Sequence, residues 1–148
     1  MGGATDIWQL RAQVFRQFAE MGRGPSLAEI AAEADIGEDA AWDALAALEA
    51  KHALVLDHDG RAIVMAHPFS AVETPFTVES GGVSWWANCA WDTFGILAAL
   101  GRDGVIHAEY AEDQAPVDIP VRGGKPEGEG VVHLLLPARE WTEDFFET

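Results

Sequence analysis

Apolar residues recur at helical spacing in the first third of the chain and predict three helices. The first is expected over Asp6–Met21, where apolar positions lie three or four residues apart and glycines follow directly. A second, short helix should begin after Ser26, which forms a capping-box pattern with Glu29. A third helix is expected over Glu38–His52, again with one apolar stripe.

A β-hairpin is predicted after the third helix. Ala53–Leu56 and Arg61–Ala66 have strand patterns, and the Asp57–Gly60 segment between them is typical of a tight turn. Three helices followed by a β-ribbon is the element order of a winged helix-turn-helix module. We therefore expect residues 1–68 to form a winged-helix-like domain.

The second half of the chain combines short strand patterns with one apolar helix. The helix should run from the region of the single cysteine to Leu100, with Gly101 ending it. The expected strands are Phe76–Glu79, Val83–Trp86, Val105–Tyr110, Val117–Val121 and Val131–Leu136. This pattern predicts a small mixed α/β domain of catalytic type over residues 69–148, and an α+β fold for the whole chain.

The charge balance argues against the DNA binding that a winged helix usually suggests. Nine Lys and Arg stand against 25 Asp and Glu, a formal charge of −16. Such a charge repels phosphate backbones and anionic membrane surfaces. The third predicted helix, which would enter the DNA groove, is itself acidic. We expect a small-molecule partner, and neither nucleic acid nor a membrane.

Other bulk features favour a cytoplasmic protein. The N-terminus lacks the basic start and apolar run of a signal peptide. The apolar runs are far shorter than the ~20 residues needed to span a bilayer. A single cysteine excludes a disulfide within the chain.

That cysteine belongs to the most informative pattern in the chain. Cys89 and Asp92 are three residues apart in a predicted helix, so they should share one face. A thiolate binds soft metals and attacks electrophiles, and a carboxyl group beside it can supply a proton. Two such close anions resist ionising together, which favours one shared proton. The alternative is a buried cysteine acting as a small apolar residue, with Asp92 bonded to nearby backbone.

Aromatic residues surround this pair. Trp86, Trp91 and Phe94 are predicted to form a substrate pocket that excludes water, although each could equally belong to the core. His107 and His133 lie on predicted strands, where a single histidine is more often structural than a metal ligand. Cys89 is therefore the one metal ligand that we predict.

The segment Trp86–Phe94, followed by Ala98–Arg102, resembles the organomercurial (alkylmercury) lyase family. That family has a cysteine, two spacer residues, an aspartate and a threonine, which enter a helix that ends near Gly-Arg. Its order of a winged-helix-like domain and a mixed α/β domain is similar to the order predicted here. Val132–Leu135 resembles a later family strand that contains a histidine.

The resemblance implies cleavage of a carbon–mercury bond by protonolysis. Cys89 would match the first family thiol and capture the metal, and Asp92 would match the proton donor. No resident cofactor is implied, because mercury is part of the substrate. The family's second cysteine would fall at Val131–Val132, and the chain has no other cysteine. The chain is thus identified as a divergent member, in which a small thiol from solution or the Asp92 carboxylate would supply the second ligand to mercury.

The sequence leaves open whether the protein is an enzyme. An alkylmercury-lyase-like enzyme would turn over its substrate at Cys89 and Asp92. The alternative is a non-catalytic protein of the same fold that binds a soft metal or a small electrophile through Cys89.

Overall fold

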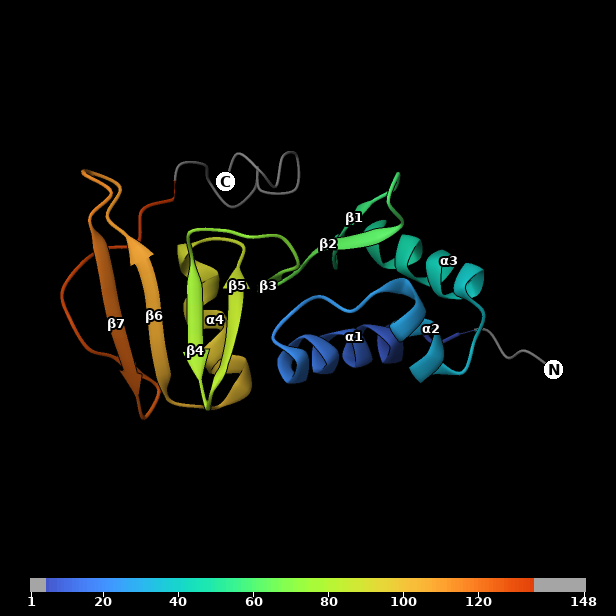
Figure 1. The fold of residues 1–148 in the computed structure, drawn as a ribbon, viewed down its shortest axis with the longest axis horizontal. Coiled ribbons are helices and arrows are strands. Elements are labelled where there is room, and N and C mark those ends of the chain that lie inside the picture. The colour runs from blue at the N-terminus through green and yellow to red at the C-terminus, as the bar shows by residue number, and fades with distance from the viewer. Residues whose placement is uncertain (1–4, 135–148) are drawn as a thin grey trace.

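The computed structural model describes residues 5–134 of the 148-residue chain. These residues form helices at the N-terminal end and an antiparallel sheet that runs the length of the molecule, with one further helix on the sheet (Figure 1). The α+β class predicted from the sequence is confirmed. In chain order the elements are α1 (Ile7–Met21), α2 (Leu27–Ala34), α3 (Glu38–Glu49), β1 (Val55–Asp57), β2 (Ala62–Ala66), β3 (Phe69–Ser70), β4 (Thr77–Ser80), β5 (Val83–Ala87), α4 (Ala90–Leu100), β6 (Gly104–Glu109), β7 (Pro116–Arg122) and β8 (Lys125–Pro126).

The end of α1 and the start of α2 lie at the signals expected from the sequence. Asp6 caps α1 by accepting from the backbone N–H groups of Trp8 and Gln9. Gly22 ends α1 with a φ of 70°, a conformation that suits glycine. The capping box between Ser26 and Glu29 at the start of α2 is present in both directions.

The described strands form one sheet, in which β3 connects the N-terminal hairpin to the rest. The order is β1-β2-β3-β5-β4-β6-β7-β8, and every neighbouring pair is antiparallel. The two residues of β3 pair on both sides: Phe69 lies opposite Ala66 and Ala87. The ends of β2 and β5 are therefore brought together at β3, although about twenty residues separate them in the sequence.

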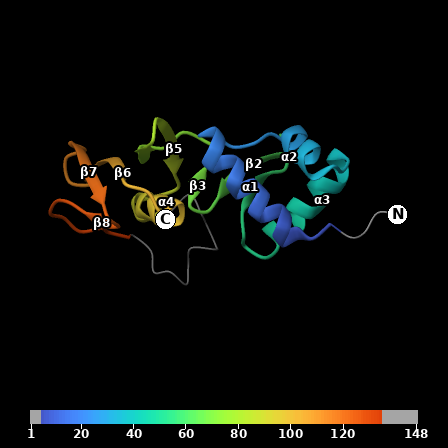
Figure 2. The ribbon, with the colours of Figure 1, turned by 90° about the horizontal axis from the view of Figure 1, so that it is seen from below.

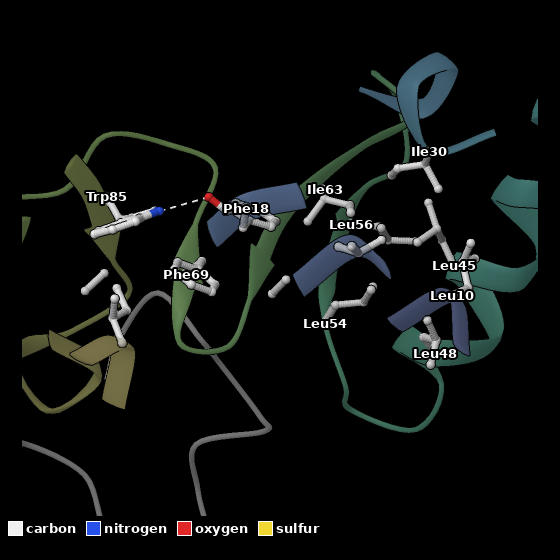
Figure 3. Close-up of a cluster of buried hydrophobic side chains, with 14 of the residues drawn as sticks. Leu10, Phe18, Ile30, Leu45, Leu48, Leu54, Leu56, Ile63, Phe69 and Trp85 are labelled. Atoms are coloured by element: carbon white, nitrogen blue, oxygen red, sulfur yellow. Dashed lines mark hydrogen bonds between the residues drawn. The ribbon is translucent and has the colours of Figure 1, made fainter. Parts of the chain in front are cut away.

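Helix α4 packs against β4, β5 and β6, while α1 lies beside β3 and reaches β5 (Figures 1 and 2). The contact between α1 and the sheet is aromatic. Phe18 stacks on Phe69 with ring centroids 5.4 Å apart, and Phe69 lies 6.5 Å from the ring of Trp85. The Trp85 indole N–H donates a 2.9 Å hydrogen bond to the Phe18 carbonyl (Figure 3). One continuous core therefore joins the helices to the sheet.

Several predicted elements differ in detail from the structure. The strand predicted over Val131–Leu136 is wrong for residues 131–134, which form no regular secondary structure, and residues 135 and 136 lie outside the described residues. Val131 is 97% exposed, so its apolar character reflects no core position in the described part of the chain. Helix α3 ends at Glu49 instead of His52, because the chain turns there and His52 has a left-handed φ of 57°.

Two expectations on organisation stay predictions. The element order of the N-terminal part is the predicted one, three helices and then the β1–β2 hairpin, but its winged-helix character is untested. The division into units of 1–68 and 69–148 falls between β2 and β3, inside a continuous sheet. Among the residues that the structure describes, no helix combines the length and apolarity needed to cross a membrane.

Replacing Phe69 by Ala should destabilise the protein strongly, because it removes the ring on which α1 and β5 meet. Phe69 is 0% exposed, and Phe-to-Ala changes in cores cost about 3–5 kcal/mol. Urea unfolding followed by tryptophan fluorescence measures this loss. The control is Tyr110→Ala at a site that is 47% exposed, where a change within about 0.5 kcal/mol is expected. Equal effects of the two substitutions would contradict the central role of Phe69.

A second prediction concerns His107 on β6. Its Nδ1 lies 2.7 Å from Asp118 Oδ1 on β7, and its Nε2 lies 3.2 Å from Glu79 Oε2 on β4. The hydrogen bond with Asp118, followed by that with Glu79, raises the pKa of His107 above 6.5. When the pKa of a histidine is higher in the folded than in the unfolded protein, the protonated ring stabilises the fold. This stabilisation is complete at a pH below the unfolded-state pKa of about 6.5, and it is lost as the pH rises through the folded-state pKa.

The free energy of unfolding of the wild type should therefore exceed that of His107→Gln by more at about pH 6 than at about pH 9. Urea titrations at the two pH values measure the difference. His52→Asn, at an exposed site away from these strands, is the control. A wild-type advantage that is independent of pH would show that His107 contributes through packing instead of charge.

Candidate active site

Cys89 and Asp92 meet at the start of α4. Cys89 is the N-cap residue, with extended backbone angles (φ −150°, ψ 177°), and follows the last residues of β5. Asp92 is the third residue of the helix, so its side chain turns back toward the cap. The Cys89 Sγ–H donates to Asp92 Oδ2 over 3.6 Å. The structure therefore brings together the two residues that the sequence predicted as catalytic.

The start of α4 is fixed by close packing. The Thr93 hydroxyl is buried and donates a 2.6 Å hydrogen bond to the Ala90 carbonyl inside the first turn. Gly95 faces the segment that connects β2 to β3: a Cβ added there would lie 3.4 Å from the Pro68 Cβ. The first turns of α4 thus lie directly against Pro68.

Partial burial makes both reactive groups hold their protons more tightly than in water. Burial is the main cause that raises the pKa of the Cys89 thiol, and the charge of Asp92 raises it further. The backbone N–H groups of Asp92 and Trp91 oppose this by favouring the thiolate, although the Cys89 side chain forms no capping hydrogen bond. Burial also raises the pKa of Asp92, against the lowering effects of His67, Cys89 and Asn88. A carboxyl group that keeps its proton to higher pH is suited to act as an acid.

The structure adds two residues that the sequence did not single out. Asn88 Nδ2 lies 3.0 Å from His67 Nδ1, and the Asn88 side chain also forms a hydrogen bond that lowers the pKa of Asp92. Burial is the main cause that lowers the pKa of His67, with a smaller contribution from Arg11 and an opposing one from Asp92. No local pattern links His67 to the pair. Only the position of Asn88 beside Cys89 pointed to this network.

The predicted substrate pocket is only partly assembled. Trp91 and Phe94 line a cavity of about 590 Å³, together with residues of β7, β8 and Val132. Trp86, Cys89 and Asp92 are not among its lining residues. Trp86 is half-buried on β5, where it pairs with Thr77 and Ser70, so its predicted role in a substrate pocket stays a prediction. Trp91 is 57% exposed and lies at the rim, one residue from Asp92.

Cys89 stands alone as a soft-metal ligand in the described part of the chain. Residues 5–134 contain no group of three or more His, Cys, Asp or Glu side chains that could hold a metal ion. His107 is instead held between two carboxylates on the sheet. His133 is exposed in a segment without regular structure. The arrangement therefore offers one sulfur and one adjacent carboxyl group.

Comparison with known proteins bears on this pair. A sequence model of a protein family described as alkylmercury lyase matches residues 69–146, just over half of the chain. The chain belongs to the alkylmercury lyase family. The resemblance predicted from the Cys89 segment is therefore confirmed. The match begins at β3, so it includes Asn88, Cys89 and Asp92. His67 precedes the matched residues.

A solved structure supports the same fold. The present structure is similar to the crystal structure of the mercury-bound form of MerB2, with a TM-score of 0.67 and 22% sequence identity. The likeness covers 84% of the present chain and 59% of the MerB2 chain, so the present chain spans less than two thirds of that protein. No curated protein sequence matches the chain.

The raised pKa of Cys89 predicts slow alkylation near neutral pH. Because Asp92 raises that pKa through its charge, Asp92→Asn should increase the thiolate fraction and speed the reaction with iodoacetamide, by roughly two- to tenfold at about pH 8. Mass spectrometry of the intact protein over time gives the rate. Asp43→Asn, an exposed change on α3, should leave it unaltered. A slower reaction in Asp92→Asn would contradict the assigned charge effect.

Proposed function

We propose that the protein cleaves carbon–mercury bonds, with Cys89 capturing the metal and Asp92 protonating the carbon. The observation that carries this proposal is the contact between the Cys89 sulfur and the Asp92 carboxyl, 3.6 Å apart in a half-buried site. A soft thiolate selects a soft metal, and burial raises the pKa of the Asp92 carboxyl, which makes it better suited than a free aspartate to carry a proton beside the sulfur. Membership of the alkylmercury lyase family supports the same chemistry.

The proposed reaction balances in three steps. The Cys89 sulfur first displaces a small thiolate from an organomercury thiolate, and the thiol proton leaves with the departing sulfur. The Asp92 carboxyl then gives its proton to the carbon, the electron pair of the carbon–mercury bond forms the new C–H bond, and the hydrocarbon departs. Mercury(II) remains bound between the sulfur and the Asp92 carboxylate. Two small thiols finally remove it as a bis-thiolate and return both protons to the protein.

The small thiol is needed because the chain contains one cysteine. A second sulfur is the preferred ligand for mercury(II), and a carboxylate is a poorer match. A thiol from solution therefore takes the place of a second protein thiol. We assign the organic group of the substrate to the cavity beside Trp91 and Phe94, which opens next to the helix that carries Asp92.

The lone thiol also favours a second candidate function, retention of a soft metal or a small electrophile without turnover. In that case the Cys89–metal adduct is the final state. The half-buried position of the sulfur limits the access of competing thiols, which slows removal of the bound metal or electrophile. The two candidates differ in whether hydrocarbon appears.

Incubation with phenylmercury acetate and excess glutathione should release benzene, detectable by gas chromatography. Cys89→Ser should lose release altogether. Asp92→Asn should still bind mercury but release benzene about 10²–10⁴-fold more slowly, the usual loss when a general acid is removed. Asp43→Asn is the matched carboxylate control and should behave as wild type.

Benzene release by Asp92→Asn at the wild-type rate would exclude Asp92 as the acid. A stable one-to-one mercury adduct on Cys89 without any benzene would refute the lyase proposal and support retention instead. Intact-protein mass spectrometry distinguishes that adduct from unmodified protein.

A further inference from the structure

We infer that His67 is a positioning residue, which through the Asn88 amide fixes the chain directly before Cys89 and so the start of the helix that carries Asp92. The inference rests on the proposed function for its catalytic consequence. It assigns part of the site to the N-terminal half of the chain, ahead of the residues that match the family.

The sheet places the two side chains together. His67 follows the last residue of β2, and Asn88 follows the last residue of β5. β3 lies between these strands, with Phe69 opposite both Ala66 and Ala87. The Asn88 backbone N–H also donates to the Pro68 carbonyl at 3.4 Å. The contact between the two side chains is therefore set by strand pairing and does not depend on a flexible loop.

The Asn88 amide NH2 group donates to His67 Nδ1 at 3.0 Å. The same side chain, as a hydrogen-bond donor, lowers the pKa of Asp92. This assignment requires His67 to accept at Nδ1 and to carry its proton on Nε2. Burial of the imidazole, which lowers the pKa of His67, is consistent with this neutral form. The same assignment leaves the Asn88 Oδ1 without a partner among the described residues.

The geometry of Asp92 matters because it has to face the sulfur and the substrate carbon. A carboxyl group that rotates away by even about 1 Å loses much of its effect in proton transfer. Without His67, the Asn88 amide loses its acceptor directly before Cys89, so the start of α4 that carries Asp92 is held less firmly. Residues that orient a reacting group in this way contribute about 10–100-fold in activity.

The test combines His67→Ala, Asn88→Ala and the double variant in the benzene-release assay. Each single change should lower kcat about 10–100-fold and leave KM within about twofold, because neither residue binds substrate. Since His67 acts through Asn88, the double variant should be no slower than Asn88→Ala alone. His67→Asn should restore most of the rate, since its amide oxygen can accept from Asn88 at the position of Nδ1.

Additive losses in the double variant would overturn the inference, and so would failure of His67→Asn to recover activity while it remains folded. His52→Asn is the exposed histidine control and should match wild type. Thermal unfolding of each variant by circular dichroism shows whether a loss of rate follows a loss of fold. A rate that falls only in proportion to the folded fraction would also overturn the inference.

Imidazole ¹⁵N NMR tests the pairing without any turnover. At about pH 7.5, His67 should be the neutral tautomer with its proton on Nε2, and its Nδ1 signal should shift in Asn88→Ala. A proton on Nδ1, or an Nδ1 signal unaffected by Asn88→Ala, would overturn the inference. If wild type releases no benzene, the proposed lyase function fails on its own, and this spectrum still decides whether His67 holds Asn88.

Discussion

The packing of Phe69 between α1 and β5 is the contact on which the rest of the structure depends. Its ring meets Phe18 on one side and Trp85 on the other, and all three side chains are at most 2% exposed. The hydrogen bond from the Trp85 indole to the Phe18 carbonyl fixes the helix relative to the strand. Because Phe69 also belongs to β3, this cluster sets the position of the short strand that joins both parts of the sheet.

The reactive pair is a local compromise between burial and hydrogen bonding. A thiol and a carboxyl group share a half-buried position at the start of α4, inside a protein with a formal charge of −16. Burial disfavours both anions, while the backbone N–H groups of the first turn and the Asn88 side chain favour them. The balance leaves protons on both groups over a wider pH range than in water, which is useful for a group that has to donate one.

Local features of this protein were predictable from its sequence, and long-range ones were not. The capping box of α2 and the contact between Cys89 and Asp92 follow from spacings of three residues, which backbone geometry alone converts into proximity. The contact between His67 and Asn88 joins residues that are 21 positions apart. It depends on the register of β3, which cannot be predicted from the local sequence. Trp86 does not line the cavity beside Trp91 and Phe94. Alternate residues of a strand face opposite sides, and its neighbour Trp85 occupies the core.

The shortness of β3 makes chain length there unusually constrained. With only Phe69 and Ser70 pairing on both sides, one inserted or deleted residue would exchange the faces of the two side chains and put a hydroxyl where an aromatic ring now sits. The same slip would draw the histidine away from the amide on the neighbouring strand. The β6–β7 connection, by contrast, is an exposed turn whose length no buried contact restricts. Insertions and deletions are therefore better tolerated in the β6–β7 connection than in β3.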